Sequence, residues 1–191
     1  MSPPAAIQHG EKDGGEEDDF YTSVEIYVKC PTIPELLNAT GLPYYWGALN
    51  KHQADILLLG RPDGTFLLRN SSQEGCAFAV TFRRRGRTRH ARVQYRGQHF
   101  SFHWGSFQSP SVRHLLEHYN DPRSCTFFEP LLSIPLNRNS PISLQELCRA
   151  SINSFIPYER IGQLPMPRAI KEYLWEYHYT ETVPAVEEER W

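Results

Sequence analysis

The chain has 191 residues, of which 40% are hydrophobic and 22% are charged. This composition is typical of one globular domain with a small appendage, and it excludes a fibrous protein. The 20 Lys and Arg against 22 Asp and Glu give a net charge of −2, which excludes a strongly basic nucleic-acid binder. The charge is unevenly distributed, because residues 1–50 carry −6, residues 51–123 carry +7 and residues 124–191 carry −3. Since 16 of the cations are Arg, which suits two-point contacts with anions, we expect the central segment to bind an anion.

Cysteine spacing and apolar runs indicate the compartment. Cys30, Cys76, Cys125 and Cys148 form no CxxC pair and no compact disulfide framework, which favours reduced thiols. No apolar run reaches the roughly 18 to 20 residues that a membrane helix needs, and the N-terminus lacks a signal-peptide pattern. We therefore expect a cytoplasmic protein without membrane insertion.

The N-terminal part predicts little regular structure before the first helices. Residues 1–29 are expected to form a disordered acidic leader, because Pro, Gly and acidic residues leave little apolar surface to bury. Residues 31–37 predict one short helix. Residues 50–58 predict a second, in which Asn50 is the N-cap and Gln53 completes a capping box.

The central part predicts a meander of strands. Strand-like runs lie at residues 65–69, 77–82, 89–95 and 99–102. The connections are too short for parallel crossovers, so the strands should pair antiparallel. A further helix is expected to start at Ser109, with Pro110 at its first position. The order predicts an α+β domain, in which a central antiparallel sheet is flanked by two helices.

After Pro135 the sequence predicts helices and no strands. In the first helix, Ser143 and Glu146 predict a capping box. Its apolar stripe consists of Leu144, Leu147, Cys148, Ser151, Ile152 and Phe155. The second helix, after a Pro-rich linker, carries Ile170, Tyr173, Leu174 and Tyr177. Two or three short helices cannot enclose their own core, so these stripes either pack on the main domain or bind another protein.

Arg69 ends the apolar strand at 65–69, where an unpaired guanidinium would cost several kcal/mol. One interpretation is a structural ion pair within the domain. The other is an anion site, in which Arg69 donates two parallel hydrogen bonds and Ser71 and Ser72 supply further donors.

The neighbouring elements favour the anion site. Period-two alternation places His90 and Arg92 on the same face of their strand. Lys51, in the first turn of the preceding helix, can add another cation. These residues together predict a phosphate pocket.

The central sequence resembles a Src-homology-2 (SH2) domain over residues 45–135. The motifs that carry the resemblance are Tyr45-Trp46-Gly47, Leu57-Leu58, Gly64-Thr65-Phe66-Leu67-Leu68-Arg69-Asn70-Ser71 and His90-x-Arg92. The resemblance implies that Arg69 grips phosphotyrosine, that Ser71 and Ser72 line the phosphate loop, and that Lys51, His90 and Arg92 complete the pocket. Asn70 departs from the family pattern, which commonly has an acidic residue there.

The C-terminal sequence resembles a SOCS box over residues 140–180, which implies a small all-helical unit followed by a flexible tail at 181–191. The SOCS box is the elongin-binding motif of the suppressor of cytokine signalling family. The resemblance implies that Leu144, Cys148 and Ile152 contact elongins, and that Leu164-Pro165-Met166-Pro167 forms the cullin-binding segment. Residues 30–44 lie where the family has an extra helix packed on the SH2 domain.

An SH2 domain followed by a SOCS box identifies the sequence as a member of this family, most similar to the members numbered four and five. The resemblance implies a non-catalytic substrate receptor that joins phosphotyrosine-containing receptors or kinases to elongins B and C, a cullin and a RING protein. It also implies negative regulation of cytokine-receptor or receptor-tyrosine-kinase signalling. The alternative function is a phosphotyrosine adaptor that blocks docking sites without promoting degradation.

Other signals are weaker. Five arginines between residues 83 and 89 favour a solvated loop over a nucleic-acid site. His114 and His118 lie off the apolar stripe of their helix and have no evident third ligand, so no metal site is expected. Hydrolase and kinase motifs are missing, and neither catalytic residues nor cofactors are expected.

Overall fold

The computed structural model describes residues 25–29, 35–71, 76–126, 129–176 and 180–184. Its strands are β1 (Glu25–Lys29), β2 (Thr65–Asn70), β3 (Cys76–Arg84), β4 (Arg87–Arg96), β5 (His99–Ser101), β6 (Ile134–Pro135) and β7 (Thr180–Pro184). Its helices are α1 (Leu36–Thr40), α2 (Lys51–Leu58), α3 (Val112–His118), α4 (Leu144–Phe155) and α5 (Arg168–Trp175), with short 3-10 helices η1 (Pro122–Ser124) and η2 (Tyr158–Gln163). Within these ranges, every helix is too short or too polar to cross a membrane.

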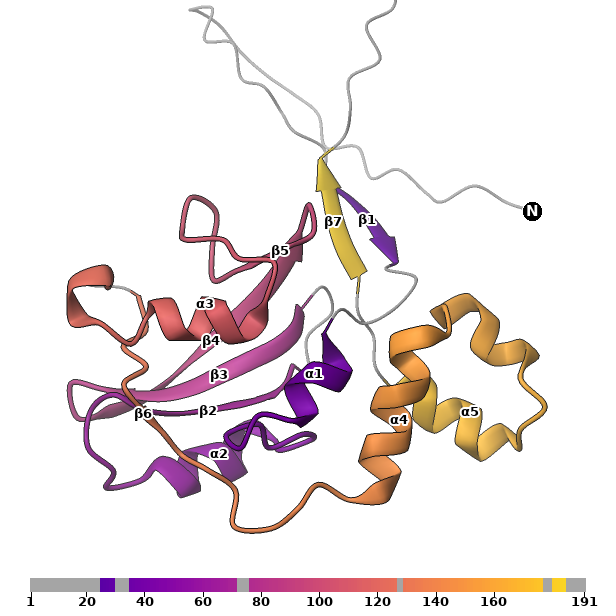
Figure 1. The fold of residues 1–191 in the computed structure, drawn as a ribbon, viewed down its shortest axis with the longest axis horizontal. Helices are drawn as coiled ribbons and strands as arrows, with labels where there is room; N and C mark the ends of the chain where they lie inside the picture. Colours follow the sequence, from indigo (N-terminus) through magenta and orange to yellow (C-terminus); the bar gives the residue numbers. More distant parts are fainter. Residues whose placement is uncertain (1–24, 30–34, 72–75, 127–128, 177–179, 185–191) are drawn as a thin grey trace, which may run out of the picture.

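Five strands form the central sheet, in the order β5-β4-β3-β2-β6 (Figure 1). Strands β2 to β5 pair antiparallel, as the short connections predicted. The edge strand β6 instead runs parallel to β2, with Ile134 opposite Thr65. A two-residue strand leaves no alternating pattern in the sequence, so β6 was not predicted.

The two faces of the sheet are covered by different helices. Leu67 of β2 packs with Ala54 and Leu58 of α2 on one face. The neighbouring Leu68 lies in the main core on the other face, which contains Leu115 of α3. The predicted capping box of α2 is confirmed, with Asn50 and Gln53 each bonding the other's backbone N–H. The order of helix, meander and helix therefore follows the prediction.

Helix α3 begins later than predicted. Its N-cap is Ser111, whose side chain accepts from the His114 N–H, and not Ser109. The backbone of Ser109 instead exchanges two hydrogen bonds with Phe100 of β5, at 2.7 and 3.0 Å. This pairing extends the sheet, so Pro110 precedes the helix instead of starting it.

The ends of the described chain also differ from the prediction. Residues 25–29 were expected in the disordered leader and residues 181–184 in the flexible tail, but they form β1 and β7, which pair antiparallel. The C-terminal region is therefore not wholly helical. The two strands are separated by about 150 residues of sequence, and a local pattern cannot reveal such a pairing. The rest of the leader, residues 1–24, and the rest of the tail, residues 185–191, lie outside the described residues.

Helix α1 connects the sheet domain to the C-terminal helices. The structure gives this helix as Leu36–Thr40, and residues 31–34 of the predicted 31–37 lie outside the described residues. The buried Leu36 lies in one cluster with Phe78 of β3 and Ala150 of α4. Arg138, in the linker before α4, donates to the carbonyl oxygens of Thr40 and Leu42 at 3.3 and 3.2 Å. The C-terminal unit is therefore packed against the main domain through α1 and its following turn.

Candidate functional site

A pocket of ≈ 480 Å³ opens on the α2 face of the sheet. Its polar and charged lining residues are Lys51, Arg69, Ser71, His90, Arg92 and Gln94. The structure thus brings together five of the six residues that the sequence predicted for a phosphate pocket. The sixth, Ser72, lies outside the described residues. Lys51 and two arginines make the pocket strongly cationic.

Arg69 is almost fully buried, with 6% of its surface exposed. Its Nε donates to the hydroxyl of Thr81 at 3.2 Å, and its Nη1 donates to the Asn70 carbonyl at 3.1 Å. Burial lowers the pKa of Arg69, although the charge of Asp55 opposes this shift. Both acceptors are neutral, and in the described part of the chain no ion pair joins Arg69 to a carboxylate. This finding favours the anion site over the structural ion pair.

A chain of hydrogen bonds leads from Arg69 to the surface. The Thr81 hydroxyl accepts from Arg69 and lies 3.0 Å from Nδ1 of His90, so its proton can point to the imidazole. Nε2 of His90 lies 3.0 Å from Oδ1 of Asp55 on α2. Burial and the charges of Arg69 and Lys51 lower the pKa of His90, while Asp55 raises it. The neutral imidazole therefore fits this network as an acceptor at Nδ1 and a donor at Nε2.

We expect the His90 imidazole to titrate below its ordinary pKa of 6.5 in the free protein. The unfolded chain then takes up this proton first as the pH falls below 6.5, so the folded state loses stability through that window. Asp55→Asn should lower the pKa of His90 further, because it removes the negative charge of Asp55, which favours the imidazolium. A titration of the ring nitrogens by NMR measures both values, with the exposed His99 as the control. An unchanged or raised pKa in the variant would contradict the network.

Thr81 and Asp55 were not predicted as parts of this site. Thr81 lies directly opposite His90 across β3 and β4, and Asp55 lies one helical turn after Lys51. A signal for Thr81 was present, since it interrupts an otherwise apolar strand. Asp55 carries no such signal, because a carboxylate on a helix surface is common.

The pocket also borders a charged cluster that holds the C-terminal unit. The side-chain amide of Asn70 donates from Nδ2 to Oε1 of Glu146 on α4 at 3.4 Å, and its Oδ1 accepts from the Tyr45 hydroxyl. Gly47, with φ of 61°, lies so near that an added Cβ would sit 3.3 Å from the same Oε1. An aspartate at position 70 would face Glu146 with a like charge. This contact gives a physical reason for Asn70, where the family commonly has an acidic residue.

Arg149 is the centre of the charged cluster. It donates to both carboxylate oxygens of Glu146 at 2.9 Å and reaches Glu176 at 3.4 Å. Its guanidinium also lies over the ring of Tyr173 of α5, 4.1 Å from the ring centre. Burial first, and the charge of Glu146 further, raise the pKa of Tyr173 to about 12, so its hydroxyl stays protonated and donates to Glu146. The cluster therefore joins α4 and α5 to the end of β2.

Only one of the two hydrogen bonds of the predicted capping box of α4 is formed in the described structure. The Ser143 hydroxyl accepts from the Glu146 N–H at 3.2 Å, as expected. The Glu146 carboxylate, which should return to the Ser143 N–H, instead bonds the buried guanidinium of Arg149. The two-point ion pair with a buried Arg outweighs the single hydrogen bond that the carboxylate would accept from a backbone N–H at the cap.

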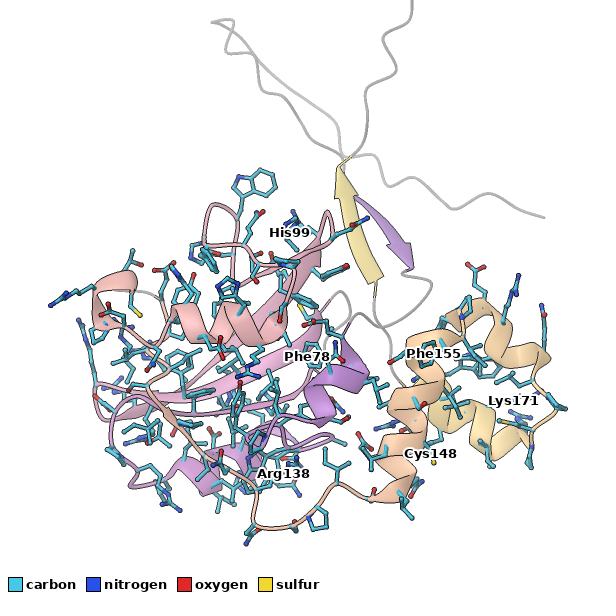
Figure 2. The ribbon with its side chains drawn as sticks, in the orientation of Figure 1. Phe78, His99, Arg138, Cys148, Phe155 and Lys171 are labelled. Atoms are coloured by element: carbon cyan, nitrogen blue, oxygen red, sulfur yellow. The ribbon has the colours of Figure 1, made fainter. Side chains whose placement is uncertain are left out.

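Helix α4 presents its apolar stripe outward. Leu144 is 79% exposed, Cys148 and Phe155 are exposed, and Ile152 is half-buried. The inward face carries Arg149, Ala150 and Asn153, all buried. Figure 2 shows Cys148 and Phe155 on α4 and Phe78 inside the main domain. Packing on the main domain therefore does not account for the stripe, and the interpretation that it faces another protein is favoured.

The Leu164-Pro165-Met166-Pro167 segment connects η2 to α5. Leu164 follows η2, and Pro167 is the residue before the first turn of α5. Pro165 and Pro167 are exposed, whereas Leu164 and Met166 are half-buried. Nothing in the described geometry brings this segment to the phosphate pocket.

His114 and His118 do not form a metal site in the described residues, where no three potential ligands gather. Both rings contact Phe107 instead, and that of His118 stacks on it with 3.8 Å between ring centres. The aromatic contact gives these residues a structural role.

Comparison with protein families matches residues 44–119 to the SH2 domain and residues 140–174 to the SOCS box. The chain is 49% identical over 160 residues to Suppressor of cytokine signaling 5 from Homo sapiens, covering 82% of this chain and 30% of that protein. It is 48% identical over 167 residues to Suppressor of cytokine signaling 4 from Mus musculus, covering 86% and 38%. It is 31% identical over 156 residues to Suppressor of cytokine signaling 6 from Homo sapiens, covering 71% and 28%. The chain thus spans about a third of the length of these relatives.

Proposed function

Because this chain belongs to the suppressor of cytokine signalling family, with an SH2 domain followed by a SOCS box, we propose that it is a substrate-recognition subunit of a ubiquitin ligase. In this role it performs no chemistry. The SH2 domain binds phosphotyrosine segments of cytokine receptors or receptor tyrosine kinases, and the SOCS box binds elongins B and C, which recruit a cullin and a RING protein. Its action is negative regulation of the bound receptor or kinase. The observation that carries the proposal is that one chain presents both a cationic pocket around a buried arginine and an exposed apolar helix.

The pocket suits phosphotyrosine by its charge and its donors. A phosphotyrosine carries about −1.5 to −2 charges and three acceptor oxygens. In the described residues, Arg69 donates hydrogen bonds to the Thr81 hydroxyl and to the Asn70 backbone carbonyl. Neither acceptor is charged, so the positive charge of Arg69 is available to the phosphate. Lys51, Ser71 and Arg92 line the same cavity and can bond the remaining oxygens.

The outward stripe of α4 suits a helix-in-groove contact. Leu144 and Cys148 lie one turn apart on the exposed face, with Ile152 one turn further. We assign these three residues to the elongins and the segment from Leu164 to Pro167 to the cullin.

Leu144→Ala is expected to weaken elongin binding by about 10- to 150-fold, because a fully buried Leu side chain contributes about 1.5 to 3 kcal/mol. The fold should be unaffected, since Leu144 is largely exposed in the free chain. The measurement is calorimetry with the elongin B and C heterodimer. Gln145→Ala, at the adjacent exposed position, is the matched control and should bind as the wild type does.

Reconstituted ubiquitylation uses the same pair of variants to separate the two functions. With elongins, cullin, RING protein and a phosphotyrosine-containing substrate, the wild type and Gln145→Ala should transfer ubiquitin equally. Leu144→Ala should transfer much less when the elongin concentration is kept near the wild-type dissociation constant. Binding of the phosphopeptide should be equal in all three. If the wild type binds the phosphopeptide and transfers no ubiquitin, the adaptor function is correct and the ligase role is wrong.

A further inference from the structure

A basic corner lies at the end of the sheet that is remote from α4 and α5. We define it by Ile56, Leu59, Arg61, Arg83, Arg85 and Arg87. The loop after α2 and the β3–β4 hairpin meet there (Figure 1), where Arg83 Nε donates to the Arg61 carbonyl at 3.3 Å. The Gly86 N–H also donates to Asp63 at 2.9 Å. The corner is therefore one fixed surface instead of two independent loops.

The arginines of the basic corner outnumber the one carboxylate, that of Asp63, that takes part in these contacts. Arg83 donates to the Gly86 carbonyl and the Thr88 hydroxyl, and Arg84 donates to the carbonyls of Glu129 and Thr126. These acceptors are uncharged, so these hydrogen bonds of Arg83 and Arg84 fix the hairpin without an ion pair. Counted with the Asp63 carboxylate, the basic corner carries a formal charge of +3. Arg61, Arg85, Arg87 and Arg89 are exposed.

Two exposed aliphatic residues lie at the end of α2, in the segment that leads into Arg61. Ile56 is 59% exposed and Leu59 is 75% exposed, at the end of α2. The core face of this helix is formed by Ala54 and Leu58, so neither residue is needed for packing. Single exposed aliphatic residues are ordinary, but two together at the edge of a concentrated positive charge combine the features of an interfacial docking surface.

We propose that the basic corner docks the protein on an anionic membrane surface. Arginine forks pair with lipid phosphates and carboxylates, while Ile56 and Leu59 enter the boundary between head groups and acyl chains. Nucleic acid would use the arginines but gain nothing from aliphatic side chains, since bases stack on aromatic rings. None of the six residues lines the phosphate pocket, so a phosphotyrosine segment and a membrane can be bound together.

The test is sedimentation of the full chain with vesicles of phosphatidylcholine, alone or with about 30% phosphatidylserine. The wild type should bind only the anionic vesicles, and binding should fall steeply between about 0.1 M and 1 M salt. Each arginine near the surface contributes about fivefold, so Arg85→Gln with Arg87→Gln should weaken binding by about 25-fold. Ile56→Ser with Leu59→Ser should also weaken vesicle binding. The loss should be greatest at about 1 M salt, where the remaining binding depends on the aliphatic side chains.

Matched controls are available on α5. Arg168→Gln removes an exposed arginine, and Ile170→Ser removes an exposed aliphatic side chain, both outside the basic corner. These variants should bind vesicles as the wild type does, and all variants should keep phosphopeptide and elongin binding. Absence of vesicle binding by the wild type, or equal losses in the controls, would overturn the proposal. Binding of single-stranded RNA that depends on Arg85 and Arg87 but not on Ile56 and Leu59, without vesicle binding, would overturn it in favour of nucleic acid.

Discussion

Arg69→Ala is expected to weaken phosphotyrosine-peptide binding by about 30-fold to several-thousand-fold. Removing one partner of a buried, hydrogen-bonded charge pair typically costs about 2 to 5 kcal/mol. Arg69 is buried beneath the pocket, and the Thr81 hydroxyl and the Asn70 carbonyl hold its guanidinium in place. Isothermal calorimetry with a phosphotyrosine peptide and its unphosphorylated counterpart measures the loss.

The controls separate charge from geometry. Arg69→Lys keeps the charge but cannot form two parallel hydrogen bonds, so it should also lose most of the affinity. Arg113→Ala removes an exposed arginine of α3 that pairs with Glu117, away from the pocket, and should change nothing. Elongin binding, which uses another surface, reports whether each variant is folded. An unchanged dissociation constant for folded Arg69→Ala would show that the pocket is not the phosphotyrosine site.

Much of this pocket could be predicted because its signals are local. Strand alternation places His90 and Arg92 on one face, and a capping box places Lys51 in the first turn of α2. An arginine at the end of an apolar strand indicates an anion or an ion-pair partner, because an unpaired buried guanidinium is costly. These features depend on residues close in sequence, whose relative positions follow from the geometry of a strand or a helix.

Other parts of the site could not be predicted, because they depend on contacts between distant residues. The pairing of Asn70 with Glu146 joins positions 76 residues apart, and α4 gives no local sign that Glu146 turns away from its cap. Burial of Arg149 was also unexpected, because a charged residue on an amphipathic helix normally faces water. The apolar residues of α4 share one face, as their spacing predicted. That face points outward, and the inward face carries the polar residues Arg149 and Asn153.

Arg149→Ala should therefore have the largest effect on stability. Arg149 is 4% exposed, and its removal leaves the Glu146 carboxylate, itself mostly buried, without its bidentate partner. Breaking a buried pair from one side typically costs about 3 to 5 kcal/mol. Glu176 is largely exposed and should contribute little. We expect the free energy of unfolding of the full chain to fall by that amount in urea, with α4 and α5 losing protection from hydrogen exchange first.

The matched control for this prediction is Arg168→Ala. Arg168 forms the same kind of ion pair with Glu172, at 2.7 Å, but its side chain is 90% exposed, so its loss should cost no more than about 0.5 kcal/mol. The double variant Arg149→Met with Glu146→Gln should recover most of the lost stability, because it leaves no unpaired buried charge. Equal effects of Arg149→Ala and Arg168→Ala would contradict the view that this cluster holds the SOCS box against the SH2 domain. Loss from Arg149→Ala without recovery in the double variant would instead assign the stability to the contact of Arg149 with the Tyr173 ring.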